Sequence, residues 1–280
     1  MAGGAGVSAP EVLIEGARVF GAPTVLLSED DDLTARAPWR EHGYTIAPFL
    51  SPELSASLRR GIEARIWKEV ERCGIRIDRG ASLERYHRSV GLRPGAHERI
   101  VKRLNKLPYR RLPIPPSSVS ERIAAICGVP LTIANPYYGM LAGLASVFGI
   151  RIVRPLSNDH NPLHRDVWLD RLRHAINIYV PLAGSDERSC LCVVPGSHRW
   201  REDEIERTQA GARVNGRRYT VPAVTGARRS LSVLRPSPGA DEVLVFSPYL
   251  IHGGASNLNP DTTRVSLEMR FWRKRPRRRP

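Results

Sequence analysis

The chain has 280 residues, of which 41% are hydrophobic and 25% are charged, and its formal net charge at pH 7 is +15. This composition indicates a globular protein with one large domain, and it excludes a membrane-spanning protein because no apolar stretch is long enough to cross a bilayer. The first residues lack the basic and apolar regions of a secretory signal, so we expect a cytoplasmic protein.

Residues 1–38 are rich in glycine and alanine and include an acidic run, and we expect them to form a partly flexible N-terminal extension. The first predicted helix follows at about 52–72, because Ser51 is a favourable N-cap and Pro52 fits the first helical position. Apolar side chains recur along it at helical spacing: Leu54, Leu58, Ile62, Ile66 and Val70.

Residues 75–117 are basic and rich in loops, with one predicted helix near 95–106, and a further helix is predicted over 118–127. From residue 131 onward the spacing of apolar residues becomes that of strands. Short strands are predicted over 131–133, 145–153, 175–180, 191–194, 242–246, 250–252 and 265–272. Helices followed by many short strands predict a mainly β fold with helices packed on an antiparallel core. The basic residues 273–280 are expected to form a solvated tail.

The main candidates for chemistry are His164 and Asp166, two residues apart in a segment that is predicted to be extended. Their side chains then project to the same face of the backbone and can bind one divalent metal. A third donor is His252, which ends an apolar strand and precedes Gly253 and Gly254, where backbone or ligand can approach closely. Two histidines and one carboxylate form one face of an iron(II) site and leave the other positions open.

The last predicted strand adds a charged face near this site. Arg264, Ser266, Glu268 and Arg270 alternate with apolar residues and therefore share one side of the strand. Arg264 lies twelve residues after His252. An arginine beside a metal suits a dicarboxylate, because the planar guanidinium pairs with a carboxylate through two hydrogen bonds.

A zinc site is the competing interpretation of the histidines. His160 and His164 have the spacing of a helical zinc pair, but Pro162 lies between them and the local sequence indicates a loop. The four cysteines include no C-x-x-C pair and are expected to be ordinary thiols in a reducing compartment.

Four motifs occur in a fixed order along residues 40–272: His-x-Asp at 164–166, Ile-Tyr-Val-Pro-Leu at 178–182, Leu-Cys-Val-Val-Pro-Gly-Ser-His at 191–198, and His-Gly-Gly at 252–254 followed by Arg264. This pattern resembles the phytanoyl-CoA dioxygenase family. The resemblance implies a domain over residues 39–272 with a double-stranded β-helix core, the jelly-roll architecture of cupins. It also implies an oxygenase that uses iron(II), 2-oxoglutarate and O₂ and releases succinate and CO₂.

The resemblance also implies roles for individual residues. His164, Asp166 and His252 match the iron ligands, and Arg264 matches the arginine that binds the distal carboxylate of 2-oxoglutarate. Halogenating relatives have a small residue where this chain has Asp166, so oxygen insertion is the expected outcome. Further candidates for binding the cosubstrate are Tyr179, Asn177 and Ser266.

The expected reaction is hydroxylation of a C–H bond of a small molecule in specialised metabolism. Basic residues around 76–111 and 213–229 suit an anionic substrate. Candidate substrate contacts are Trp168, His87 and Arg88. Two alternatives remain: a cupin-like metal protein or isomerase, which needs no 2-oxoglutarate, and a non-catalytic basic nucleic-acid-binding protein. Scattered arginines and an aromatic content of 6% argue against nucleic acid, and we expect no membrane partner.

Overall fold

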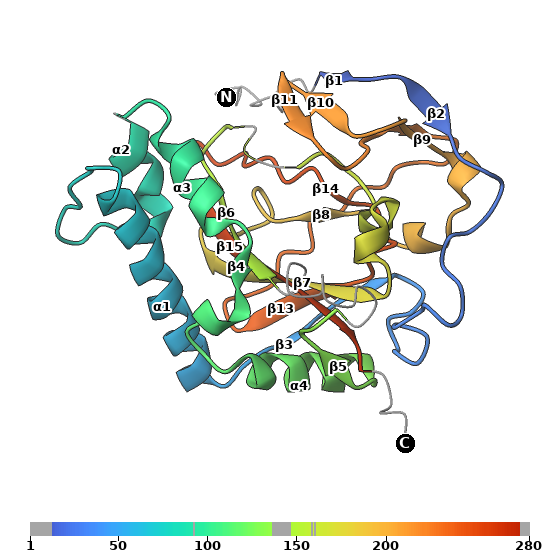
Figure 1. Cartoon of the computed structure of the whole chain (residues 1–280), viewed down its shortest axis with the longest axis horizontal. Coiled ribbons are helices and arrows are strands. Elements are labelled where there is room, and N and C mark those ends of the chain that lie inside the picture. Colours follow the sequence, from blue (N-terminus) through green and yellow to red (C-terminus); the bar gives the residue numbers. More distant parts are fainter. Residues whose placement is uncertain (1–12, 92, 136–146, 158, 160, 275–280) are drawn as a thin grey trace, which may run out of the picture.

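The structure is a computed structural model that describes residues 13–91, 93–135, 147–157, 159 and 161–274. Its long helices lie in the first half of the chain and most strands in the second half (Figure 1). The helices are α1 (Pro52–Glu71), α2 (Tyr86–Gly91), α3 (Ala96–Leu104) and α4 (Pro116–Cys127). The strands are β1 (Ile14–Glu15), β2 (Arg18–Phe20), β3 (Tyr44–Pro48), β4 (Leu107–Pro108), β5 (Leu131–Thr132), β6 (Val147–Val153), β7 (Ala175–Ala183), β8 (Cys192–Val193), β9 (Ile205–Thr208), β10 (Ala212–Val214), β11 (Arg217–Tyr219), β12 (Val224–Ala227), β13 (Glu242–Phe246), β14 (His252–Gly253) and β15 (Arg264–Arg273).

The core is a large antiparallel sheet with a small sheet packed against it. The large sheet has the order β3-β13-β7-β15-β6-β4, with β5 joined to β15, and the small sheet pairs β14 with β8. An apolar cluster between the two sheets includes Tyr179 and Phe246 from the large sheet and Leu191 and Val193 from the segment around β8. The fold is mainly β with a double-stranded β-helix core, which confirms the expected fold class.

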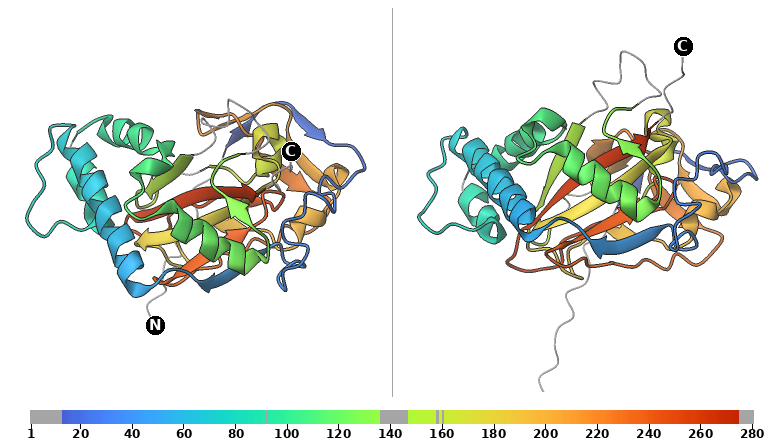
Figure 2. Two further views of the ribbon diagram at one scale, coloured as in Figure 1. Left: turned by 60° about the horizontal axis from the view of Figure 1, so that its bottom comes forward. Right: turned by 90° about the horizontal axis from the view of Figure 1, so that it is seen from below.

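The helices pack on the other face of the large sheet (Figure 2). Helix α1 begins where predicted: Ser51 Oγ accepts a hydrogen bond from the Leu54 backbone N–H at 3.4 Å, and Pro52 occupies the first turn. Its apolar stripe packs in one core cluster with side chains of β6, β7 and β15. Each fully buried Leu or Ile of that stripe contributes about 1.5–3 kcal/mol to stability, so the helix depends on the sheet.

Three of the elements that differ from the sequence predictions lie between residues 75 and 194. Residues 175–181 are all buried, although their alternation is typical of a half-exposed strand, because both faces of β7 are covered. The predicted strand over 191–194 is only the two-residue β8. Helix α2, within the region predicted to be loop-rich, was missed because it has only six residues.

Part of the predicted N-terminal extension pairs with the second half of the chain. Strand β1 pairs with β10, and β2 pairs with β9, at one end of the molecule (Figure 1). Residues 1–12 and 275–280 lie outside the described residues, and the domain boundaries at 38 and 273 remain predictions. Among the described helices, none has both the length and the apolar character that crossing a bilayer requires.

His198 is buried beside the start of β3 and couples stability to pH. Its Nε2 donates to the Arg40 carbonyl at 2.9 Å, its Nδ1 has no partner among the described residues, and burial lowers its pKa from 6.5 to about 4. The unfolded chain therefore takes up a proton more readily than the folded protein. We expect the free energy of unfolding to decrease as the pH falls from about 6.5 to about 4, by at most about 1.4 kcal/mol per pH unit for this group.

Urea unfolding of the metal-free protein across that pH range measures the effect. His198→Gln should give a flatter dependence on pH than the wild type, whatever its absolute stability. The same slope in both proteins would show that His198 does not carry the effect.

Candidate metal centre

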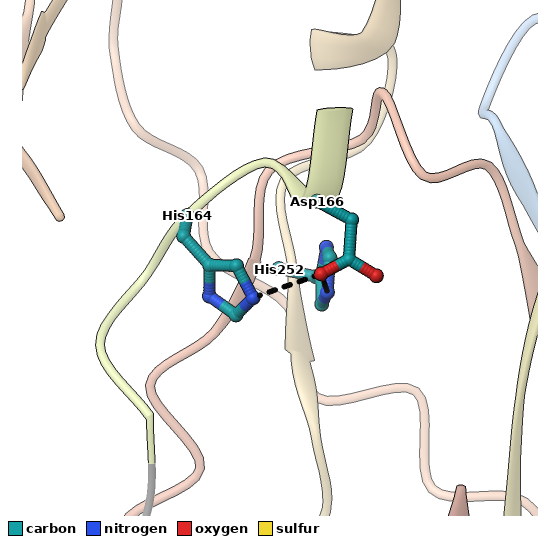
Figure 3. A group of neighbouring side chains, drawn as sticks. All are labelled: His164, Asp166 and His252. Atoms are coloured by element: carbon teal, nitrogen blue, oxygen red, sulfur yellow. Dashed lines mark ion pairs between the residues drawn. The ribbon is translucent and has the colours of Figure 1, made fainter. Parts of the chain in front are cut away.

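The side chains of the three predicted metal ligands lie together (Figure 3), and a short backbone bridge joins the segments of His164 and His252. The His164 N–H donates to the His252 carbonyl at 2.8 Å, and the His252 N–H donates to the His164 carbonyl at 2.9 Å. Arg165 lies between His164 and Asp166 in the sequence, and its side chain projects away from theirs. It donates hydrogen bonds to Glu202 and to the Ser197 and Trp200 carbonyls. This alternation is that of an extended segment, as the spacing of the motif predicts.

The three side chains converge on one point in the protein interior. His164 Nε2 lies 3.4 Å from Asp166 Oδ1, and His252 Nε2 lies 3.9 Å from the same oxygen. One donor atom from each of the three residues lies within 4.8 Å of the others, and all three residues are buried. Two imidazoles and a carboxylate in this arrangement fit one face of an iron(II) site.

Backbone carbonyls fix the orientation of both rings. His164 Nδ1 donates to the Pro162 carbonyl at 2.7 Å, and His252 Nδ1 donates to the Leu250 carbonyl at 2.9 Å. Each ring therefore presents the lone pair of Nε2 toward Asp166, as a metal ligand requires. Burial and the neighbouring His164 lower the pKa of His252 to about 4, so its imidazole is neutral at physiological pH.

The second oxygen of Asp166 is held by two side chains of the large sheet. Arg270 donates to Oδ2 through Nε at 3.1 Å and Nη2 at 2.8 Å, and Asn177 donates to it through Nδ2 at 3.0 Å. Burial acts to raise the pKa of Asp166, but the charged guanidinium of Arg270 outweighs it, so the pKa lies well below its ordinary value. Asp166 is thus ionised, with Oδ1 left for a metal.

Arg270 was not among the predicted site residues. The signal for it was present, because Arg270 shares one face of its strand with Arg264. Asn177, predicted beside the cosubstrate, contacts Asp166 instead of Arg264 in the described hydrogen bonds.

Arg264 lines the same cavity as His164 and His252 and is buried. Its Nη1 lies 3.3 Å from Ser266 Oγ, and its guanidinium carbon lies 5.7 Å from the centre of the Tyr179 ring. Its Nε is buried and makes no hydrogen bond with the described residues. A buried guanidinium on the wall of a cavity is suited to bind a carboxylate, because its planar fork can form two hydrogen bonds with it.

Trp168 lies outside this cavity. It lines a second cavity, its indole Nε1 donates to Glu202 Oε2 at 2.9 Å, and the Arg207 guanidinium stacks on it at 4.9 Å. The structure therefore does not bring Trp168 to the metal ligands, although it follows Asp166 by only two residues.

His87 and Arg88 are also separate from the metal cavity. Both bind Asp261: His87 Nε2 lies 2.9 Å from Oδ1, and Arg88 Nη2 donates to Oδ2. Neither is among the described residues that line the cavity. His160, the partner in the alternative zinc pair, lies outside the described residues.

Gly253 makes the contact between the two histidine segments possible. Its φ is +113°, and a Cβ at this position would lie 2.3 Å from the Pro162 carbonyl oxygen and 3.0 Å from His164 Nδ1. Those two atoms form the hydrogen bond that orients His164. We expect Gly253→Ala to lower the free energy of unfolding by about 1–3 kcal/mol through strain and to weaken iron(II) binding about 10- to 100-fold.

Gly80→Ala is the matched control, since Gly80 also has a positive φ (+85°) but a Cβ there would meet no atom within 4 Å. Anaerobic equilibrium dialysis with iron(II) and urea unfolding measure the two quantities. The interpretation fails if Gly253→Ala binds iron(II) as tightly as Gly80→Ala does.

A facial triad of two histidines and a carboxylate, opening into a cavity with a buried arginine inside a double-stranded β-helix, defines the class: an iron(II)- and 2-oxoglutarate-dependent oxygenase. The family model for phytanoyl-CoA dioxygenase matches residues 39–266, which is most of the chain. The chain therefore belongs to the phytanoyl-CoA dioxygenase family. No curated protein sequence matches it.

Solved structures with similar folds include AviO1 from Streptomyces viridochromogenes Tue57, with 18% identity, a TM-score of 0.50 and coverage of 86% of this chain and 94% of that chain. EctD from S. alaskensis in its apoform has 14% identity, a TM-score of 0.45 and coverage of 94% and 85%. SnoK, a non-heme α-ketoglutarate-dependent carbocyclase from nogalamycin biosynthesis, has 18% identity, a TM-score of 0.43 and coverage of 90% and 87%. These likenesses concern the fold.

Proposed function

We propose that this oxygenase hydroxylates a C–H bond of a small molecule in the biosynthesis of a specialised metabolite, with His164, Asp166 and His252 as its iron ligands. The observation that carries the proposal is the orientation of the two rings: both Nδ1 atoms are bound to carbonyls, and both Nε2 atoms face Asp166 Oδ1. Iron(II) at this position, with 2-oxoglutarate bound, would activate O₂ for oxidation of the substrate with release of succinate and CO₂.

The residues of the chain then have distinct tasks. Arg270 and Asn177 hold Asp166 so that only Oδ1 faces the metal position. Arg264, supported by Ser266 and the ring of Tyr179, would bind the distal carboxylate of 2-oxoglutarate. The buried position of Arg264 on the wall of the metal cavity supports this assignment, and an isomerase that uses no dicarboxylate would need no such arginine. Asp166 favours oxygen insertion over halogenation.

A cytoplasmic location is part of the same proposal. All four cysteines are free thiols, although Cys190 and Cys192 lie only two residues apart. Free cysteines suit a reducing compartment.

Two measurements test the proposal in sequence. Anaerobic addition of iron(II) and 2-oxoglutarate should give a weak visible absorption band that needs both additions. Small molecules that then raise succinate release in air should yield products heavier by one oxygen atom. A product that has lost two hydrogens or kept its mass would contradict hydroxylation but leave the oxygenase class intact, whereas failure of the band would contradict the assigned site.

A further inference from the structure

The metal cavity contains an ion pair that has no part in the arrangement described so far. Arg151 and Glu268 both line the cavity, and Arg151 Nε lies 2.8 Å from Glu268 Oε2. Their side chains keep 27% and 24% of their surface exposed. Both charges are therefore accessible to a molecule inside the cavity.

The sheet places this pair next to the cosubstrate and metal positions. Arg151 is on β6 and Glu268 is on the adjacent β15, where Arg151 is opposite Ser266. Because side chains alternate along a strand, Glu268 shares its face of β15 with Arg264 and Arg270. The pair thus lies on the same wall as the arginine assigned to 2-oxoglutarate and the arginine bound to Asp166.

Each member of the pair has atoms left over. Within the described residues, the only hydrogen bond of this pair is the one from Arg151 Nε to Glu268 Oε2, which leaves both terminal nitrogens of Arg151 and Oε1 of Glu268 unused. Burial acts to raise the pKa of Glu268, but Arg151, together with the charges of Arg270 and Arg264, outweighs it, and the pKa lies below its ordinary value. Glu268 is therefore ionised at neutral pH.

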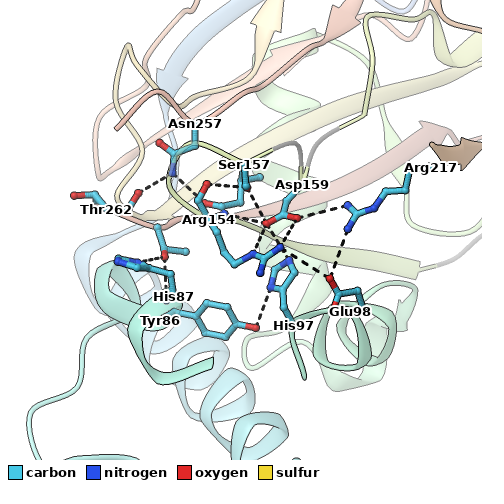
Figure 4. Close-up of polar contacts among 12 residues, drawn as sticks. Tyr86, His87, His97, Glu98, Arg154, Ser157, Asp159, Arg217, Asn257 and Thr262 are labelled. Carbon is cyan, nitrogen blue, oxygen red and sulfur yellow. Dashed lines mark hydrogen bonds and ion pairs between the residues drawn. The ribbon is translucent and has the colours of Figure 1, made fainter. Parts of the chain in front are cut away.

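Asp159, another carboxylate on the cavity wall, differs in this respect (Figure 4). Arg154 donates to both of its oxygens, at 2.7 and 3.0 Å, and His97 Nε2 lies 3.1 Å from Oδ2. Arg217 approaches Oδ1 to 3.5 Å. Both oxygens of Asp159 therefore already have partners within the protein. Glu268 is the better-placed carboxylate to bind a ligand cation.

We propose that Arg151 and Glu268 bind the polar end of the substrate, and that the substrate carries the head group of an α-amino acid, with its carboxylate on Arg151 and its ammonium on Glu268. The proposal rests on the proposed function, because it takes this cavity to be the place of oxidation. An amino acid has its two opposite charges side by side, as the ion pair does, so the four charges are complementary. A purely anionic substrate, as the basic composition suggested, would be repelled by Glu268.

The desolvation of this ion pair is the physical reason to expect that a ligand binds to it. Partial removal of two charges from water is unfavourable, and a single hydrogen bond between them compensates only part of this cost. A zwitterion supplies the missing partners: a planar guanidinium binds a carboxylate through two nitrogens, and a carboxylate oxygen accepts from an ammonium group.

The test uses the full chain, anaerobically loaded with iron(II) and 2-oxoglutarate. The probes are the proteinogenic L-amino acids, each with its N-acetyl and carboxamide forms. At least one free amino acid should shift the visible band and raise succinate release once air is admitted, and both blocked forms should bind about 10- to 100-fold more weakly. Glu268→Gln keeps the shape of the side chain and should raise the KM for that amino acid about tenfold or more, with the Kd of 2-oxoglutarate unchanged.

Glu41→Gln is the control, since it removes the carboxylate of the exposed Arg199–Glu41 pair outside the cavity. Arg151→Lys, which keeps the charge but not the fork, gives a second measurement should Glu268→Gln fold poorly, and it should weaken binding of the same amino acid. The proposal is overturned if the band forms but no amino acid shifts it, if blocked and free forms act alike, or if both variants bind like the wild type. Absence of the band would overturn the proposed function and this inference together.

Discussion

Replacement of His164 by alanine is expected to abolish iron(II) binding at micromolar metal and to reduce succinate formation to background. The two remaining donors, Asp166 and His252, cannot complete a face of the metal. Loss of residues that merely orient metal ligands costs about 10- to 100-fold in affinity or activity, so loss of a ligand itself should exceed that range. Anaerobic dialysis with iron(II) and quantification of succinate measure the two effects.

This variant separates chemistry from folding. His164→Ala leaves the hydrogen bonds from Arg270 and Asn177 to Asp166 in place, so we expect the variant to fold. Thermal unfolding measures whether it does. His42→Gln is the matched control, because His42 is exposed and is not among the residues that line the metal cavity. Full turnover in His164→Ala would show that the assigned triad is wrong.

Replacement of Arg264 is expected to have the next largest effect, on binding of 2-oxoglutarate. Removing one partner of a buried charge pair costs about 2–5 kcal/mol, which corresponds to roughly 30-fold or more in Kd. Arg264→Ala should therefore lose the anaerobic visible band at 2-oxoglutarate concentrations that saturate the wild type. Arg264→Lys should recover only part of the affinity, because lysine keeps the charge but not the planar fork.

The affinity for iron(II) in the absence of 2-oxoglutarate should be nearly unchanged in both Arg264 variants, in contrast to their affinity for 2-oxoglutarate. Arg235→Lys is a suitable control: Arg235 Nη1 donates to the Cys190 and Ser256 carbonyls, and the residue does not line the metal cavity. Equal affinity for 2-oxoglutarate in Arg264→Ala and the wild type would favour a metal protein that uses no dicarboxylate.

Local sequence was sufficient for the features that depend on spacing along one segment. The helix over 52–72 follows from a cap at Ser51 and an apolar stripe, and α1 forms there. His164 and Asp166 face the same way because an extended backbone alternates its side chains. The helices of 95–106 and 118–127 were predicted within two residues of α3 and α4, because their apolar spacing is regular.

Features that depend on what lies opposite a segment could not be predicted. Arg270 lies on the same face of its strand as Arg264. Only the pairing of β15 with β7 places Arg270 against Asp166. Trp168 follows the His-x-Asp motif, but the short 3₁₀ helix at Asp166–Trp168 turns it toward Glu202. Neither outcome is encoded in the spacing of neighbouring residues.

The candidate metal ligands and Arg264 could thus be named from the sequence alone. His164 and Asp166 share one side of an extended segment, His252 ends an apolar strand, and the order of the motifs matches one family. The tertiary structure decided which groups surround them: the carbonyls that orient His164 and His252, the arginine on Asp166, and the Arg151–Glu268 pair that faces the same cavity. The reason is physical. Alternation along a strand sets the face on which a side chain lies, but contacts across the cavity arise only when strands far apart in the sequence pair in one register.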